Sequence, residues 1–233
     1  MRINQYLAHC GICSRRKAEE LIKNKEVYLN DVLVENLATE VNDGDKVTYK
    51  GNVVTLEKEY VYYMLNKPKG YMCTVSDDQN RPTVLDIVKS KVRIYPVGRL
   101  DYNTEGLLLL TNDGEWANKV IHPSSNIYKT YKVLLKTRPR TDKLDLIRDG
   151  VEYEGVKYAP ANVTRPVFED GLYSVNVTIS EGKNREIRNI FEAVGYKVFA
   201  LKRISIGKLR LGDLPVKSYR KLTEKDKKLI FER

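Results

Sequence analysis

Hydrophobic and polar positions in the first 57 residues follow two short helical patterns and then several extended ones. Apolar residues recur at helical spacing within residues 3–8 and again within residues 18–22. Gly11 ends the first pattern, and Ser14 is a suitable N-cap for the second. Strands are predicted between turn-forming residues, at residues 27–29, 32–34 and 47–49. The pattern therefore predicts two helices followed by a small strand meander.

Beyond residue 60 the pattern is dominated by strands. Extended apolar stretches predict strands at residues 61–65, 107–110, 131–135, 173–180 and 198–201. In residues 173–180 apolar and polar side chains alternate, which indicates one buried face. Helical spacing predicts helices near residues 84–88 and 116–121, over 184–194 and from Thr223. We therefore expect an α+β fold in two domains, residues 1–57 and 60–233.

Composition limits the class of protein. The 233 residues are 42% hydrophobic and 31% charged, which excludes a disordered chain and leaves room for one large or two modest domains. No apolar stretch approaches the ~18 residues that a membrane span needs. The first residues lack the apolar stretch of a signal peptide, so we expect a cytoplasmic protein. Three cysteines argue against a framework of disulfides.

The net charge of +10 is unevenly distributed. Residues 182–233 carry fifteen basic and six acidic side chains, whereas residues 1–58 carry nine of each. Residues 1–25 nevertheless hold six basic and only two acidic side chains. A localised positive charge is typical of proteins that bind a polyanion, namely nucleic acid or an anionic membrane surface.

The second predicted helix begins with three cations, Arg15, Arg16 and Lys17. The positive end of the helix dipole disfavours them there, and contact with a phosphate backbone would offset that cost. An ordinary solvated basic turn is the alternative interpretation. Together with Arg2, Leu7, Gly11, Ala18, Glu19, Val27, Asn30 and Gly44-Asp45, this segment resembles the RNA-binding domain first seen in ribosomal protein S-four. The resemblance implies RNA binding through Arg2, Ser14, Arg15, Arg16 and Lys17.

A second candidate site lies in the polar loop of residues 98–106, between two strand signals. Asp101 occupies the middle of the loop, and loops held by rigid strands commonly carry catalytic groups. Arg99 could keep the Asp101 carboxylate ionised or bind a phosphate. Alternatively, Asp101 is a turn residue whose side chain accepts hydrogen bonds from nearby amides.

Four segments in order resemble the RsuA-type ribosomal RNA pseudouridine synthase family. They are Gly98-Arg99-Leu100-Asp101 with the following Thr104 and Gly106-Leu107-Leu108, Lys129-Thr130-Tyr131, Glu181 to Arg188, and Leu201-Lys202-Arg203-Ile204. Asn66-Lys67-Pro68-Lys69-Gly70 also fits. Lys183 stands where arginine is common in the family, and Asn189 stands where a second basic residue often follows. The resemblance covers nearly the whole chain and implies a catalytic domain built on a mixed or antiparallel sheet.

The resemblance also implies roles for individual residues. Asp101 would be the catalytic carboxylate, Arg188 would pair with it, and Tyr131 would form a platform for the uracil ring. Leu201 would close the apolar side of the pocket, and the substrate contacts would come from Arg99, Asn184 and Arg185. Core packing is an equal interpretation for Leu201, and a packed strand tyrosine is the alternative for Tyr131. Isomerisation imports no electron or group, so no cofactor and no metal is expected.

The sequence leaves several questions open. Asp101 could attack the sugar, attack the base, or remove a sugar proton. The resemblance favours ribosomal RNA as the partner, and we expect a monomer. The Asn184-Arg185 pair and the match over Leu107 to Gly114 favour the large ribosomal subunit over the small one. A ribosome-assembly factor that binds RNA without turnover and a protein of the membrane surface are the alternatives. Cys10 and Cys13 form a C-x-x-C pair next to His9, but they lack further nearby ligands, so we expect them to pack rather than to bind a metal.

Overall fold

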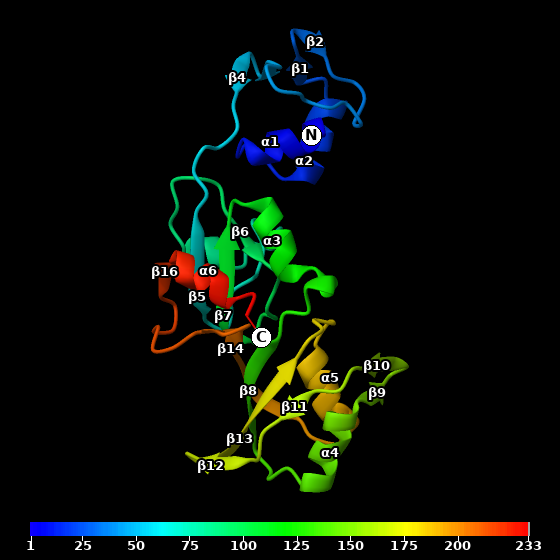
Figure 1. Cartoon of the computed structure of the whole chain (residues 1–233), viewed down its shortest axis with the longest axis vertical. Coiled ribbons are helices and arrows are strands. Elements are labelled where there is room, and N and C mark those ends of the chain that lie inside the picture. The colour runs from blue at the N-terminus through cyan, green and yellow to red at the C-terminus, as the bar shows by residue number, and fades with distance from the viewer. Residues whose placement is uncertain (233) are drawn as a thin grey trace. The chain divides into compact units, whose positions relative to one another are not determined.

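The computed structural model describes residues 1–232, which divide into two compact units (Figure 1). The first unit consists of Met1–Val61 together with Ser90–Ile94 and Asn112–Gly114, and the second contains the rest. The domain boundaries at residues 57 and 60 stay a prediction, because two short segments from later in the chain also belong to the first unit.

The first unit has the predicted two helices and strand meander. The helices are α1 (Ile3–His9) and α2 (Arg15–Lys23). A four-stranded antiparallel sheet of order β2-β1-β3-β4 follows, formed by β1 (Val27–Leu29), β2 (Val32–Leu33), β3 (Val47–Tyr49) and β4 (Asn52–Val54). The predicted N-cap is confirmed, because the Ser14 hydroxyl accepts a hydrogen bond from the Lys17 amide at 3.2 Å.

The helices and the sheet of this unit share one apolar core. Ile3 and Leu7 of α1, Ala18 of α2 and Val27 and Val47 of the sheet are fully buried. Each large side chain of this kind contributes about 1.5–3 kcal/mol of burial free energy. The apolar residues at helical spacing in the sequence are therefore the ones that fasten the two helices to the sheet.

The second unit is built on a ten-stranded mixed sheet. Its main path has the order β11-β13-β8-β14-β7-β5-β16, and β12, β15 and β6 pair with β13, β14 and β7. The bounds are β5 (Tyr62–Lys67), β6 (Tyr95–Val97), β7 (Glu105–Thr111), β8 (Lys129–Leu135), β11 (Asn162–Val163), β12 (Val167–Glu169), β13 (Leu172–Ile179), β14 (Val198–Ile206), β15 (Leu209–Arg210) and β16 (Tyr219–Lys221). The predicted α+β class with a mixed sheet is confirmed.

Helices and a hairpin complete the second unit. They are the 3-10 turns η1 (Val84–Asp86) and η2 (Pro123–Ser125), the helices α3 (Gly114–Ile121), α4 (Thr141–Asp149), α5 (Glu186–Ala193) and α6 (Glu224–Leu229), and the hairpin β9 (Val151–Tyr153) with β10 (Val156–Tyr158). Helices α4 and α5 and this hairpin lie together beside β11 and β13 (Figure 1). Leu144 and Ile147 of α4 and Ile190 and Phe191 of α5 are almost completely buried.

Two predicted helices differ from the observed ones. Arg185 adopts a left-handed backbone conformation with φ of 50°, so α5 begins at Glu186 rather than at residue 184. The stretch at residues 84–88 forms only the short turn η1, which Thr83 and Asp86 close with a capping box. The predicted helix from Thr223 is confirmed as α6, with the Thr223 hydroxyl accepting from the Asp226 amide at 3.1 Å.

One pairing joins the two halves of the large sheet. β14 runs antiparallel to β8 but parallel to β7, and the parallel contact has only two register pairs, Lys202 with Glu105 and Arg203 with Gly106. Gly106 has a φ of +107°, and a Cβ there would lie 2.2 Å from the Arg203 carbonyl oxygen. Glycine is therefore required for β7 and β14 to approach each other at this point.

None of the helices within residues 1–232 has the length and apolar character needed to cross a membrane.

Candidate active site

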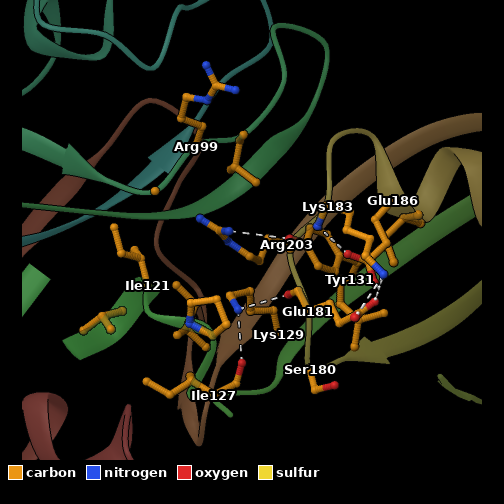
Figure 2. A pocket seen from close by; sticks show the side chains of 18 of the residues that line it. Arg99, Ile121, Ile127, Lys129, Tyr131, Ser180, Glu181, Lys183, Glu186 and Arg203 are labelled. Atoms are coloured by element: carbon orange, nitrogen blue, oxygen red, sulfur yellow. Dashed lines mark hydrogen bonds and ion pairs between the residues drawn. The ribbon is translucent and has the colours of Figure 1, made fainter. Parts of the chain in front are cut away.

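A cavity of about 630 Å³ opens in the second unit where β8 and β14 meet the loops before β7 and α5. Asp101, Tyr131 and Leu201 line it, so the structure brings three of the sequence-predicted residues together. Figure 2 shows side chains from these segments converging on the cavity. The loop that ends at β7 and the strands β8 and β14 are thus the elements that position the candidate site.

Asp101 lies in the loop between β6 and β7 and is half-buried. Its backbone carbonyl accepts hydrogen bonds from the Thr104 amide at 3.0 Å and from Lys67 Nζ at 3.1 Å. Within residues 1–232 the carboxylate forms no ion pair shorter than 4.0 Å and accepts no hydrogen bond. The loop is therefore held through its backbone, and the carboxylate is left available to a ligand in the cavity.

Lys67, at the end of β5, is the group that holds this loop. Its side chain is fully buried, and Nζ donates to the carbonyl oxygens of Pro68, Asp101, Tyr102 and Thr104 at 3.0–3.5 Å. Burial lowers the pKa of Lys67, while the negative charges of the nearby Asp101 and Glu105 carboxylates act in the opposite direction. Sequence reasoning included Lys67 in a matching segment but gave it no role.

Tyr131 and Arg203 face each other across the antiparallel pair β8 and β14, because they are partners in the register. Arg203 Nη1 lies 3.5 Å from the Tyr131 hydroxyl, and the guanidinium carbon lies 6.0 Å from the centre of the ring. Leu201, two residues before Arg203, presents its side chain to the same cavity. All three side chains are more than nine-tenths buried.

Arg188 projects from α5 and is half-buried. It donates to the carbonyl oxygens of Val198 at 3.4 Å and Asn103 at 3.5 Å. Burial and the charge of Arg185 lower the pKa of Arg188, whereas the charge of Asp101 raises it. No ion pair shorter than 4.0 Å joins Arg188 to Asp101 within residues 1–232, so their pairing stays a prediction.

Two further ionisable groups line the cavity, a half-buried lysine and a buried glutamate. Lys129 Nζ donates to the carbonyl oxygens of Ile127 and Glu181, both at 3.2 Å (Figure 2). Burial and the charge of Arg203 lower the pKa of Lys129. Burial raises the pKa of Glu186, whose carboxylate accepts a hydrogen bond from the Lys183 amide at 2.7 Å.

The predicted substrate contacts occupy different places. Arg99 lines the cavity but is exposed, and Figure 2 shows its guanidinium pointing away from Tyr131 and Arg203. Arg185 also lines the cavity as an exposed side chain. Asn184 is exposed and does not line it; its carbonyl accepts a hydrogen bond from the Asn189 amide group at 3.4 Å. Arg99 and Arg185 are thus the two predicted contacts that border the cavity.

The predicted RNA-binding residues lie in the first unit, at the start of its two helices. Ser14, Arg15, Arg16 and Lys17 are all exposed, and Lys17 forms an ion pair with Glu20 at 2.6 Å. Arg2 is exposed at the N-cap of α1, and its backbone forms an isolated bridge to Glu40. The first turn of α2 therefore offers cations to solvent.

Cys10 and Cys13 are free thiols packed against the core of the first unit. Burial raises the pKa of Cys10 to about 11, so the thiol is protonated at neutral pH. No group of three histidine, cysteine or acidic side chains within residues 1–232 is placed to hold a metal ion.

Sequence reasoning missed Arg203 and Lys129 as members of the cavity, although strand periodicity carries the signal. Residues two apart in a strand point to the same face. Lys129 therefore accompanies Tyr131, and Arg203 accompanies Leu201, once β8 and β14 are recognised. The cross-strand partnership of Tyr131 with Arg203 could not be read from either strand alone.

The two units define an enzyme that modifies RNA bases, attached to a small RNA-binding module. The chain belongs to the RNA pseudouridylate synthase family, whose model matches residues 61–193. An S4 domain model matches residues 1–47. The resemblance seen in the sequence is therefore confirmed, both for the catalytic family and for the N-terminal domain.

Named relatives and a solved structure agree with this assignment. The ribosomal large subunit pseudouridine synthase B of Bacillus subtilis is 42% identical over 98% of this chain and 95% of its own length. The ribosomal small subunit pseudouridine synthase A of Escherichia coli is 34% identical over 97% of this chain and 98% of its own. A crystal structure of a pseudouridylate synthase, 30% identical, superposes with a TM-score of 0.71 and covers 99% of both chains.

Proposed function

We propose that the protein converts specific uridines of ribosomal RNA to pseudouridine, with Asp101 as the catalytic carboxylate. Membership of the pseudouridylate synthase family supports the reaction, and the names of relatives that span the whole chain support ribosomal RNA as substrate. The observation that carries the role of Asp101 is its placement: a half-buried carboxylate without a protein partner, in the same cavity as Tyr131 and Leu201.

The reaction moves the ribose from one atom of the ring to another. The bond between N1 and C1′ breaks, a bond between C5 and C1′ forms, C5 loses a proton and N1 gains one. Asp101 acts as nucleophile or as base at the start. Tyr131 supports the face of the ring, Leu201 closes the apolar side, and Arg188 orients the carboxylate once RNA is bound. The target base leaves its stack to reach the cavity.

The two domains divide the work. Residues 1–57 bind RNA through the exposed cations of α2, and residues 60–233 carry the chemistry. Exposed Arg99 and Arg185 hold the nucleotides next to the target, and Asn184 contributes a further contact near the cavity. The enzyme acts as a monomer in the cytoplasm, where ribosomal RNA is its partner.

The decisive experiment is release of tritium from C5 of labelled uridine in ribosomal RNA fragments. The wild-type protein should release label, and Asp101→Asn should not, because the amide can act neither as nucleophile nor as base. Asp170→Asn is the matched control, since Asp170 is exposed in the turn between β12 and β13. RNA binding without release by the wild type would indicate the alternative, a ribosome-assembly factor without turnover.

The ribosomal subunit can be tested separately. We propose the large subunit, because the Bacillus subtilis relative, which shares 42% identity, carries that name, whereas the small-subunit enzyme of Escherichia coli shares 34%. Pseudouridines should be mapped in both ribosomal RNAs from cells with and without the gene. Loss of a modification from small-subunit RNA alone would overturn this assignment.

A further inference from the structure

Arg203 carries a buried positive charge that nothing in the described chain neutralises. Its side chain is 4% exposed and lines the cavity. Within residues 1–232 it forms no ion pair shorter than 4.0 Å with a carboxylate. Burial of an unpaired cation costs several kcal/mol, so an unpaired arginine at this depth indicates a partner that arrives with the ligand.

Two contacts hold the Arg203 guanidinium in one orientation and leave one of its nitrogen donors without a hydrogen-bond partner. Nε donates to the Leu107 carbonyl oxygen at 2.7 Å, and Nη1 lies 3.5 Å from the Tyr131 hydroxyl. Nη2 is buried and has no hydrogen-bond partner. Because the guanidinium is planar, these two contacts fix the direction of its remaining donors. An unsatisfied donor on a residue that lines a binding cavity is suited to an acceptor on a ligand that packs against it.

A second cation, Lys129, lines the cavity near Arg203, and the buried acid Glu186 lines it as well. Lys129 lies near enough for the charge of Arg203 to lower its pKa, after the larger effect of burial. Lys129 donates only to carbonyl oxygens, and Glu181 is already paired with Lys183 at 2.8 Å. A ligand group that carries or develops negative charge is therefore favoured beside Arg203.

The burial of Arg203 indicates that the negatively charged group of the ligand beside it belongs to the base and not to a phosphate. Arg99, Lys183 and Arg185 also line the cavity, and all three are exposed, as suits contacts with the RNA backbone. Arg203 is buried and lies against Tyr131, the proposed platform for the ring. A nucleotide that enters base first would bring its ring carbonyl oxygens, rather than its phosphates, to this depth.

We propose that Arg203 donates a hydrogen bond from Nη2 to a carbonyl oxygen of the target uracil and stabilises the negative charge of the ring during the reaction. When the N1–C1′ bond breaks, its electron pair stays with the uracil and spreads over N1, O2 and O4. Attack by Asp101 on the ring would likewise place charge on O4. The charge disappears when C5 bonds to C1′, any bond that Asp101 has formed to C1′ or to the ring breaks, C5 loses its proton and N1 is protonated. Arg203 neither gains nor loses a proton, and its role rests on the proposed function.

The test compares Arg203→Met with Arg203→Lys under single-turnover conditions. Loss of one donor that meets developing charge should lower the tritium-release rate by about 10²–10³-fold, whereas the Kd for RNA changes less than about threefold. Lysine should restore part of the rate, because it keeps a positive charge without the fixed fork of donors. Lys202→Met is the matched control, since Lys202 is the preceding residue of β14 and does not line the cavity.

A second substrate separates charge stabilisation from a structural effect. Fluorine at C5 withdraws electrons, so a 5-fluorouracil ring needs less help with its negative charge. The deficit of Arg203→Met, measured as loss of unmodified 5-fluorouridine from RNA by mass spectrometry, should be smaller than with uridine. An equal deficit with both bases, a wild-type rate, or a loss confined to RNA affinity would overturn the proposal. If Arg203→Met does not fold, the same comparison is made with Arg203→Lys. Absence of turnover by the wild-type enzyme would instead refute the proposed function.

Discussion

Lys67 holds Asp101 by its backbone rather than by its side chain: Lys67 Nζ donates to the Asp101 carbonyl oxygen at 3.1 Å. The same ammonium group donates to the Thr104 carbonyl oxygen at 3.0 Å, so it spans the whole turn. A charged donor at the centre of several carbonyl oxygens fixes the path of a loop that has no regular secondary structure. The position of the candidate catalytic carboxylate thus depends on a residue 34 positions earlier in the chain.

Replacement of this donor should damage both stability and turnover. Lys67→Met removes the ammonium donor shared by these carbonyl oxygens, of which the Thr104 oxygen is buried, at a cost of about 1–3 kcal/mol in the free energy of unfolding. The single-turnover rate should fall more than the RNA affinity does, because the Asp101 loop loses its support. Urea denaturation and the tritium-release assay measure the two effects. Lys69→Met is the control, since Lys69 is half-exposed and its Nζ lies 4.0 Å from Glu105; equal losses in both variants would refute the role of Lys67.

Gly106 should tolerate no side chain. A Cβ at this position would lie 2.2 Å from the Arg203 carbonyl oxygen, and the φ of +107° disfavours any other residue. Gly106→Ala should therefore lower the free energy of unfolding by about 2 kcal/mol or more. Thermal unfolding checks this against Gly182→Ala, where the added Cβ meets nothing within 4 Å. Similar Tm values for the two variants would contradict the close approach of β7 and β14.

Glu186 should make stability depend on pH in a defined direction. Burial raises its pKa above the value in the unfolded chain, so folding favours the protonated acid. The buried charge of Glu186 therefore lowers the free energy of unfolding only where the acid is ionised. This loss of stability is absent at low pH and appears as the pH rises through the folded-state pKa. Glu186→Gln keeps an oxygen that can accept from the Lys183 amide and removes the charge. The variant should be more stable than the wild type at pH 7, and the difference should vanish below about pH 4.

The control for this experiment is Glu152→Gln, because Glu152 is exposed in β9. Its stability should follow that of the wild type at every pH. Chemical denaturation from pH 3.5 to 8 gives the comparison. A Glu186→Gln variant that is less stable than the wild type at pH 7 would show that attraction to Lys183 and Lys129 outweighs burial.

The first turn of α2 should account for part of the salt dependence of RNA binding. Arg15 and Arg16 are exposed and form no ion pair shorter than 4.0 Å within residues 1–232. Their joint replacement by glutamine should lower the slope of log K against log salt by up to about 2, one for each lost phosphate contact. Filter binding over a range of salt concentrations measures the slope.

A matched pair of lysines tests whether the position of the charge matters. Lys46 and Lys50 belong to the same unit and are already paired with Asp31 at 2.9 Å and Glu26 at 3.8 Å. Their joint replacement by glutamine removes the same charge but should leave the slope nearly unchanged. Equal slopes for the two double variants would mean that only the net charge counts.

Sequence patterns predicted those helices and strands whose caps or alternating side chains are set by neighbouring residues. Ser14 was identified as an N-cap from its type and position, and the structure confirms its bond to the Lys17 amide. The alternation in residues 173–180 predicted β13 because its buried apolar residues, Val175, Val177 and Ile179, all face one side. Helix α4 was missed, since Leu144 and Ile147 are its only buried residues and two positions do not define a stripe. Strand β16 was missed because it gains its pairing from β5, more than 150 residues away along the chain.

In the candidate site too, a sequence motif located some residues, whereas the contacts between distant segments emerged only from the structure. A motif resemblance located Asp101 and Tyr131, and the structure places both in one cavity. The donor left unsatisfied on Arg203 follows from contacts with Leu107 and Tyr131, which lie on two other strands. The predicted pairing of Arg188 with Asp101 would need a contact between a helix and a loop, and no local pattern fixes the distance between them.

The short parallel contact between β7 and β14 has a consequence for assembly. Asp101 belongs to the half of the sheet that ends at β7, whereas Tyr131 and Leu201 belong to the half that begins at β14. Neither half carries all three of these cavity-lining residues. On the proposed roles of these residues, activity requires the joined sheet, and a folding intermediate in which only one half has formed would be inactive.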